Sequence, residues 1–401
     1  MLSVPLAHQL LAEYGSPLYC YDAERLRADI ARITRAVPYA DTRFHFASVV
    51  NGNLALLRIF RAAGWGLHAN TPGDVFLGLR AGFAPPEIVF SGGHLTRAEL
   101  AELLAQGIGT INLDSLAQLE QWGEVLEKHP PAVLPRLGFR LNLPAVTGEN
   151  RTGVSVDELS EAVSFAARYG LKVSGIHFYR GTGTNATQAF TASIAAVLDA
   201  GRVLPDWSYL DFGGGFGYPY RAETAGFDWE LFGAELTRQL NAFERPLALV
   251  IEPGRAAIAG CGVLLATVVA VKWQGAKQIV GVDSSIANIA VLSVHGGHRG
   301  ISALKEHDGE CFTTDVCGNT TYSRDYLGRG CRLPRLQPGD VLAIQDVGAY
   351  GYAMATHFLH RPRPAEVLIE AGVQRLIRRR ETYDALLAQQ CDEPHQENPT
   401  P

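Results

Sequence analysis

Phe44-His45-Phe46-Ala47-Ser48-Val49-Val50-Asn51-Gly52-Asn53 is an apolar run that leads into a polar turn, and a segment with helical periodicity follows at once. A short apolar run rich in aromatic and β-branched residues and bounded by turn residues predicts a buried strand. We therefore interpret residues 44–50 as the first strand of a series in which strands and helices alternate.

The same alternation continues for about 210 residues. Further strand-like runs occupy 65–69, 87–91, 109–113, 136–142, 172–178, 208–212 and 247–251. Segments with helical periodicity lie between them, at 53–63, 73–82, 96–106, 115–128, 156–169, 187–203 and 228–243. Strict alternation predicts parallel strands, and eight of them predict an α/β fold with a closed (β/α)8 barrel. An open doubly wound sheet is the alternative.

The chain changes character on both sides of this series. Before it, a helix is predicted at 5–15, a strand at 17–21, and a helix at 23–37 capped by Asp22. After Arg255 the pattern becomes rich in strands and predicts an antiparallel β domain, with helical character returning only at 371–389.

These patterns divide the chain into four parts. Residues 1–43 are an N-terminal segment that leads into the barrel, 44–254 form the barrel, 255–385 form the C-terminal β domain, and 386–401 are a polar tail expected to be disordered.

Composition excludes several classes of function. The 401 residues carry a net charge of -6 without any block of Lys or Arg, which argues against nucleic acid as a partner. No apolar run is long enough to cross a membrane, and the N-terminus shows no secretory signal. The six cysteines have no metal-binding spacing, so we predict no metal site and a cytoplasmic location.

Two motifs follow predicted barrel strands, where the functional groups of such barrels lie. Asp211-Phe-Gly-Gly-Gly-Phe-Gly217 presents three successive glycines (Gly213, Gly214 and Gly215) whose amides could approach a phosphate, although a plain turn explains them equally well. Glu252-Pro-Gly-Arg255 follows the last strand, and its carboxylate could accept a proton from a pyridinium nitrogen.

Two more motifs lie in the predicted β domain. Asp346-Val-Gly-Ala-Tyr-Gly351 offers the Tyr350 hydroxyl as a phosphate ligand, and Asp315-Val-Cys317 offers a thiol. A buried core tyrosine and a buried thiol are the simpler alternatives.

Taken in chain order, these motifs resemble those of the fold-type III pyridoxal-phosphate decarboxylases, which include the diaminopimelate, ornithine and arginine decarboxylases. The resemblance covers roughly residues 15–370. The resemblance implies a barrel with a β domain of the alanine-racemase type, to which the N-terminal segment 1–43 contributes a strand, and pyridoxal phosphate as cofactor. It also implies a homodimer with shared active sites, in which Cys317 reaches the partner's site. The residues that it places around the cofactor are Arg140, His177, Gly213, Gly214, Gly215, Glu252, Gly254, Arg255 and Tyr350.

The chain departs from the family at four positions around the cofactor ring. In that family a lysine of the first barrel strand binds the cofactor as a Schiff base, and Val49 stands at its place. His68 replaces an aspartate, Tyr179 replaces the histidine that stacks on the ring, and Gly318 replaces the acid after the cysteine. An engineered Lys→Val change and natural divergence both explain Val49, and the three accompanying changes favour divergence.

The substrate position is also altered. Val291 stands near the place of an arginine that binds the distal carboxylate of diaminopimelate, so diaminopimelate is not the expected substrate. We expect a decarboxylase for a small amino acid, or for an amino-acid unit of a conjugate such as a siderophore precursor. The alternative is a catalytically silent relative that binds a ligand or a regulatory partner.

Overall fold

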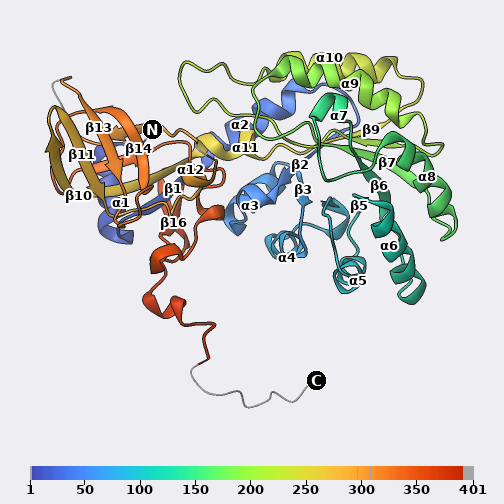
Figure 1. The fold of residues 1–401 in the computed structure, drawn as a ribbon, viewed down its shortest axis with the longest axis horizontal. Coiled ribbons are helices and arrows are strands. Elements are labelled where there is room, and N and C mark those ends of the chain that lie inside the picture. The colour runs from blue at the N-terminus through green and yellow to red at the C-terminus, as the bar shows by residue number, and fades with distance from the viewer. Residues whose placement is uncertain (1, 296, 307–308, 392–401) are drawn as a thin grey trace. The chain divides into compact units, whose positions relative to one another are not determined.

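The computed structural model describes residues 2–295, 297–306 and 309–391, and these divide into two compact units (Figure 1). One unit comprises Ala23–Gly260. The other combines Met1–Asp22 with Cys261–Pro401, so the first strand of the chain belongs to the same unit as the C-terminal half.

The unit Ala23–Gly260 is a closed barrel of eight parallel strands joined in sequence order. Its strands are β2 (Thr42–Ala47), β3 (Gly66–Ala69), β4 (Ile88–Phe90), β5 (Thr110–Leu113), β6 (Arg136–Leu141), β7 (Val173–Phe178), β8 (Tyr209–Asp211) and β9 (Ala248–Ile251). β9 pairs with β2, with Phe44 beside Ile251, and this pairing closes the ring. The predicted barrel is confirmed, and the open sheet is excluded.

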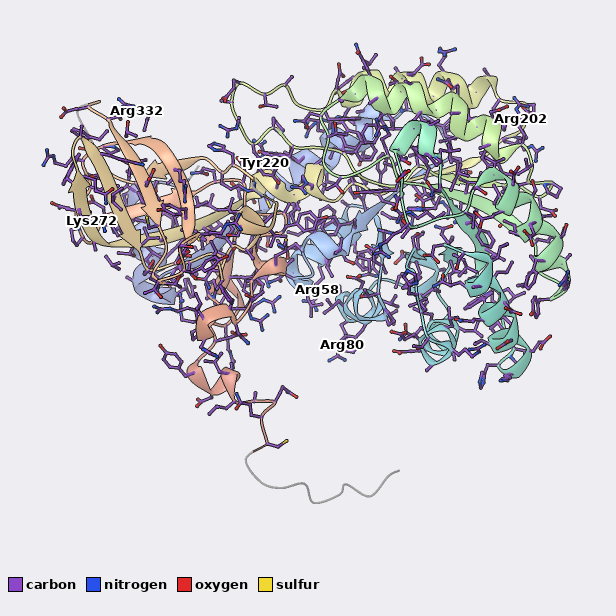
Figure 2. All side chains as sticks on the ribbon, in the orientation of Figure 1. Arg58, Arg80, Arg202, Tyr220, Lys272 and Arg332 are labelled. Carbon is purple, nitrogen blue, oxygen red and sulfur yellow. The ribbon has the colours of Figure 1, made fainter. Side chains whose placement is uncertain are left out.

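Helices alternate with these strands and form the outer layer. They are α2 (Ala23–Ala36), α3 (Leu54–Ala62), α4 (Pro72–Ala81), α5 (Arg97–Gln106), α6 (Leu116–Lys128), α7 (Pro144–Thr147), α8 (Val156–Ala167), α9 (Thr187–Gly201), α10 (Trp229–Ala242) and α11 (Arg255–Ile258), with short 3-10 turns at Ser48–Val50, Pro85–Glu87 and Ala259–Cys261. Figure 2 shows the exposed side chains of Arg80 on α4 and Arg202 after α9 on this layer.

The helix starts follow from local capping chemistry. Thr71, Thr96 and Ser155 each accept a hydrogen bond from the backbone of the third helical residue, whose acidic side chain bonds back to the cap. Such reciprocal boxes satisfy two amide groups that a helix start otherwise leaves without partners. They fix where α4, α5 and α8 begin, and hence the length of the loops above the barrel.

The second unit is built around a mostly antiparallel sheet. Its strands are β1 (Leu18–Asp22), β10 (Gly262–Gln274), β11 (Lys277–Val282), β12 (Ile301–Ala303), β13 (Phe312–Cys317), β14 (Tyr326–Leu333), β15 (Val341–Ile344), β16 (Ala365–Glu370) and β17 (Val373–Arg378). β1 lies between β10 and β16, so the N-terminal strand pairs within this sheet. Helices α1 (Val4–Tyr14) and α12 (Val291–His295) and 3-10 turns at Tyr352–Met354, Phe358–His360 and Tyr383–Leu386 complete the unit.

The predicted helical character over 371–389 is wrong. Residues 373–378 form β17, which returns antiparallel to β16 through Ala371 and Gly372. Both turn residues have positive φ, 48° and 78°, and a two-residue loop of this kind matches the twist of a hairpin. Most of the predicted disordered tail, 392–401, lies outside the described residues.

The core of the barrel unit is strongly aromatic. Phe190 of α9 and Phe232 of α10 contact each other, and both contact Phe216 and Phe227. Trp229 packs against Phe232. Over the described part of the chain, we find no helix with the length and apolarity needed to span a membrane.

Candidate active site

The carboxyl ends of β7, β8 and β9 bring the predicted phosphate loop and the predicted acid together. Gly213 follows β8 with φ of 65°, and a Cβ there would lie 2.2 Å from the Phe178 carbonyl oxygen, so only glycine fits. The Gly213 amide donates to Asp211 and its carbonyl accepts from the Glu252 amide. Among the described residues, the amides of Gly214 and Gly215 donate to no recorded partner, which leaves them for an anion.

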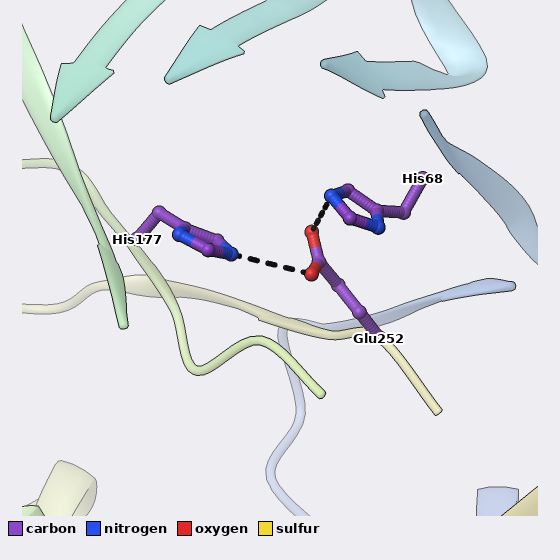
Figure 3. Close-up of side chains that lie close together, drawn as sticks. All are labelled: His68, His177 and Glu252. Carbon is purple, nitrogen blue, oxygen red and sulfur yellow. Dashed lines mark hydrogen bonds and ion pairs between the residues drawn. The ribbon is translucent and has the colours of Figure 1, made fainter. Parts of the chain in front are cut away.

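Glu252, at the end of β9, lies between two histidines (Figure 3). Its Oε1 is 3.4 Å from Nε2 of His68 on β3, and its Oε2 is 3.3 Å from Nε2 of His177 on β7. All three side chains are buried. The two imidazole rings are nearly parallel, with an interplanar angle of 15° and centroids 6.1 Å apart.

Burial controls protonation in this cluster. It lowers the pKa of His177 to about 4 and that of His68 well below its ordinary value, because the charged imidazolium loses its hydration. It raises the pKa of Glu252 to about 8, against the opposing effects of Asp211 and Arg140. At neutral pH both histidines are therefore neutral and Glu252 retains a proton for much of the time.

A polar layer inside the barrel supports Glu252. Asp211 is fully buried beside it, and burial followed by the charge of Glu252 raises the Asp211 pKa well above its ordinary value. Asn112 of β5 donates to Ser91 at 2.9 Å and to Asp211 at 3.4 Å, and accepts from the Tyr209 hydroxyl at 2.8 Å. Asn112 was not among the predicted site residues, although an asparagine inside an apolar strand is a visible sign of a buried polar contact.

Arg140 and Tyr179 are adjacent in this unit. The guanidinium carbon of Arg140 lies 5.2 Å from the centre of the Tyr179 ring, a cation–π arrangement. The Tyr179 hydroxyl is 3.0 Å from the Thr182 hydroxyl, and a Cβ on Gly215 would lie 3.4 Å from the tyrosine ring. The ring of Tyr179 therefore lies next to the glycine loop.

Val49 lies in the 3-10 turn Ser48–Val50 directly after β2, and its side chain is 45% exposed. Gly254 follows Glu252, and a Cβ there would lie 2.4 Å from Val50, so the two strand ends approach closely. Arg255 begins α11, and its guanidinium donates to the Tyr220 hydroxyl.

The remaining predicted site residues belong to the β unit. Cys317 ends β13 and is half-buried, and Tyr350 adopts φ of 57° in the turn after β15. The glycine at 318 has a local cause, because a Cβ there would lie 2.1 Å from an Asp325 carboxylate oxygen. Asp325 accepts hydrogen bonds from the amides of Ile286 and Thr320, so its carboxylate occupies the space beside Gly318.

Comparison with known proteins agrees with this geometry. Residues 23–259 match the family model described as pyridoxal-dependent decarboxylase, pyridoxal binding domain. The chain belongs to this family. Pyridoxal phosphate is accordingly its cofactor, and its fold-type III architecture is the one that the motifs predicted.

Relatives cover nearly the whole chain. The diaminopimelate decarboxylase of Methanothermobacter thermautotrophicus is 33% identical over 95% of this chain and 93% of its own length, and that of Escherichia coli K12 is 30% identical over 95% of each. Among solved structures, the Helicobacter pylori diaminopimelate decarboxylase complexed with L-lysine matches with a TM-score of 0.88 at 25% identity, covering 95% of this chain and 98% of that one.

The residues of the barrel fit two ends of the cofactor. Oε1 of Glu252 is buried and makes no hydrogen bond among the described residues, with Nε2 of His68 3.4 Å away, so it can pair with the ring nitrogen of the cofactor. The Gly214 and Gly215 amides suit the phosphate. Val49, at the position that the sequence motif predicts for the family's lysine, carries no amine.

Proposed function

We propose that this decarboxylase holds pyridoxal phosphate without a covalent bond and acts on a small amino acid or an amino-acid unit of a conjugate such as a siderophore precursor. Bound pyridoxal phosphate supplies the electron sink for loss of carbon dioxide from an α-amino acid. Two observations carry the proposal: among the described residues, the buried Glu252 Oε1 makes no hydrogen bond, and the amides of Gly214 and Gly215 in the neighbouring loop donate none.

The barrel residues then have separate tasks. Gly214 and Gly215 bind the phosphate through their amides, together with Gly213 and Gly254, which allow the backbone to approach closely. Glu252 faces the ring nitrogen and shares one proton with it, and the raised pKa of Glu252, about 8, keeps that proton in the pair at neutral pH. The face of Tyr179 stacks on the ring as a histidine would, and Arg140 supplies positive charge behind it.

We also propose roles for Cys317 and Tyr350, which the resemblance assigns to the family's cofactor site. Burial, with Asp315 and Asp325, raises the pKa of the Cys317 thiol, so the thiol stays protonated and can donate a proton at the substrate α-carbon. We propose that it does so in the partner subunit of a two-fold homodimer. Tyr350 donates its hydroxyl to the phosphate.

The substrate proposal rests on Val291. It begins α12 as a buried apolar residue, and it offers no cation for a distal carboxylate. This supports a substrate other than diaminopimelate, which is the substrate named for the relatives. The alternative, a silent relative that binds a ligand or partner, is favoured by Val49 alone.

Spectroscopy and turnover together test this function. The purified full-length protein should acquire an absorbance band with added pyridoxal phosphate that dialysis removes, and Glu252→Ala should weaken this binding. Pyridoxal, which lacks the phosphate, should bind at least about tenfold more weakly. Release of carbon dioxide from a panel of α-amino acids then identifies the substrate. A band without turnover on any amino acid would favour a silent relative that binds the cofactor. No band would reject the proposed function in favour of a silent relative that binds another ligand or a partner.

A further inference from the structure

We propose that the barrel unit binds a small organic carboxylate with an apolar body in a cavity at the amino ends of its strands. The cavity has a volume of about 720 Å³. It is lined by the starts of β2 and β6, the end of α5, and the loops that precede β4, β5 and β6. Its volume lies within the range of small-molecule sites, about 300–1,000 Å³.

The cavity lies at the other end of the barrel from the cofactor site. Arg43 is the second residue of β2 and Arg136 is the first residue of β6, and both line the cavity. Gly213 and Glu252 instead follow the carboxyl ends of β8 and β9. Because all strands of the barrel run parallel, amino ends and carboxyl ends face opposite sides. A ligand in this cavity therefore leaves the cofactor site free.

Backbone contacts fix the walls of the cavity. The Gly109 amide donates to the Pro85 carbonyl at 3.0 Å, and the Arg136 amide donates to the Gly109 carbonyl at 3.0 Å. A Cβ on Gly109 would lie 2.3 Å from the Pro86 carbonyl oxygen, so this close approach of two loops requires glycine. The loops before β4, β5 and β6 are thus tied together, and the cavity between them is formed before any ligand binds.

Two arginines give the cavity positive charge. Among the described residues, neither Arg43 nor Arg136 has an ion pair, and Arg136 donates to the Thr110 hydroxyl at 3.2 Å and 3.0 Å. Their charges reach the nearby His45: burial lowers its pKa to about 3, and the positive charges of Arg136 and Arg43 act in the same direction. This pair of charges favours an anion as the ligand.

No nearby acid neutralises Arg43 within the lining of the cavity. A second cavity, of about 560 Å³, adjoins the first, and Arg43 and Pro86 line both. Of the described residues that line the two cavities, Glu87 alone carries a carboxylate. That carboxylate accepts a hydrogen bond from the Ala84 amide at 2.7 Å within its own turn. The Arg43 guanidinium therefore remains available to a ligand carboxylate, which its planar geometry matches.

Apolar side chains form much of the remaining lining. Leu104 and Ile108 are buried, whereas Val133 and Leu134, in the loop before β6, are 79% and 51% exposed. Large apolar side chains exposed together beside a cavity are typical of a surface that a ligand covers. This lining suits the hydrocarbon body of an organic acid and offers little to inorganic phosphate. The cavity thus combines a cation for the carboxylate with an apolar wall for the body.

Calorimetric titration of the full-length protein with octanoate tests the site. One octanoate should bind per chain with a Kd below about 1 mM. Octylammonium, acetate and inorganic phosphate should each bind at least about tenfold more weakly, because each lacks either the negative charge or the apolar body. Octanoate binding should be the same with and without pyridoxal phosphate, since the two sites lie at opposite ends of the barrel.

Two substitutions locate the binding. Arg43→Gln removes the cation and Leu134→Asp places a carboxylate in the apolar wall, so each should weaken octanoate binding at least about tenfold. Arg80→Gln on α4 and Leu231→Asp on α10, at exposed residues outside the cavity, are the matched controls and should change nothing.

Three results would overturn the site. The first is the absence of octanoate binding, and the second is binding that persists unchanged in either variant when circular dichroism shows that it is folded. The third is displacement of octanoate by pyridoxal phosphate, which would assign octanoate to the cofactor site.

Discussion

At the scale of single residues, the polar layer below Glu252 depends on one hydroxyl. Tyr209→Phe removes the donor to Asn112 Oδ1 and leaves that oxygen buried without it. The free energy of unfolding should fall by about 1–3 kcal/mol, the cost of an unsatisfied buried group. Urea denaturation measures this free energy. Tyr383→Phe, at a residue that is 70% exposed, is the control. Equal effects of the two changes would contradict the account.

Glu381 gives the β unit a pH dependence. Burial opposes its ionisation, but hydrogen bonds from the Arg363 side chain and amide and from His357 lower its pKa to about 2. A carboxyl group whose pKa is lowered in the folded state stabilises the fold at pH values above its unfolded-state pKa. This contribution disappears as the pH falls through the folded-state pKa.

Glu381→Gln should therefore lower the free energy of unfolding by about 1–2 kcal/mol at pH 7, as expected for hydrogen bonds to a charged group. The difference from the unsubstituted protein should shrink as the pH falls from about 5 to about 2. Denaturation at a series of pH values measures this difference in unfolding free energy. Glu149→Gln, at an exposed residue, is the control. A difference that stays constant with pH would rule out the ion pair as its source.

At the scale of elements, the aromatic cluster ties α9 and α10 to the segment after the glycine loop. Phe190→Ala should lower the free energy of unfolding by about 3–5 kcal/mol, because the cavity lies among rings that cannot collapse into it. Thermal and denaturant unfolding check this value. Phe76→Ala on α4, at a 57% exposed side chain, should have little effect, and a comparable loss there would refute a cluster-specific role.

The elements also show what sequence reasoning can reach. Alternating strands and helices predicted the barrel, and barrel geometry then placed Gly213 and Glu252 at neighbouring strand ends, because functional groups gather there. The contacts of Glu252 with His68 and His177 were not predictable, since residues 68 and 252 meet only through closure of the ring. The hairpin at Ala371 and Gly372 was missed because local composition suggested a helix.

At the scale of the whole molecule, the proposed function requires two chains. If Cys317 acts in the partner's site, light scattering should give about twice 43.4 kDa. Mixing a Cys317→Ala protein with a Glu252→Ala protein should restore part of the activity that each lacks alone, because one of the two shared sites in a mixed dimer is intact. A monomer at micromolar concentration, or no restoration in a mixed dimer, would exclude a shared site.

The most direct measurement concerns the lysine position. Val49 is exposed in the turn directly after β2, in the barrel whose Glu252 and glycine loop fit pyridoxal phosphate. After treatment with pyridoxal phosphate and borohydride, the unsubstituted protein should carry no adduct and should lose the cofactor on dialysis. Val49→Lys should carry a reduced adduct at residue 49 by mass spectrometry and should retain the cofactor, whereas Val49→Met should behave as the unsubstituted protein does. A Val49→Lys protein with neither adduct nor improved retention would contradict the account.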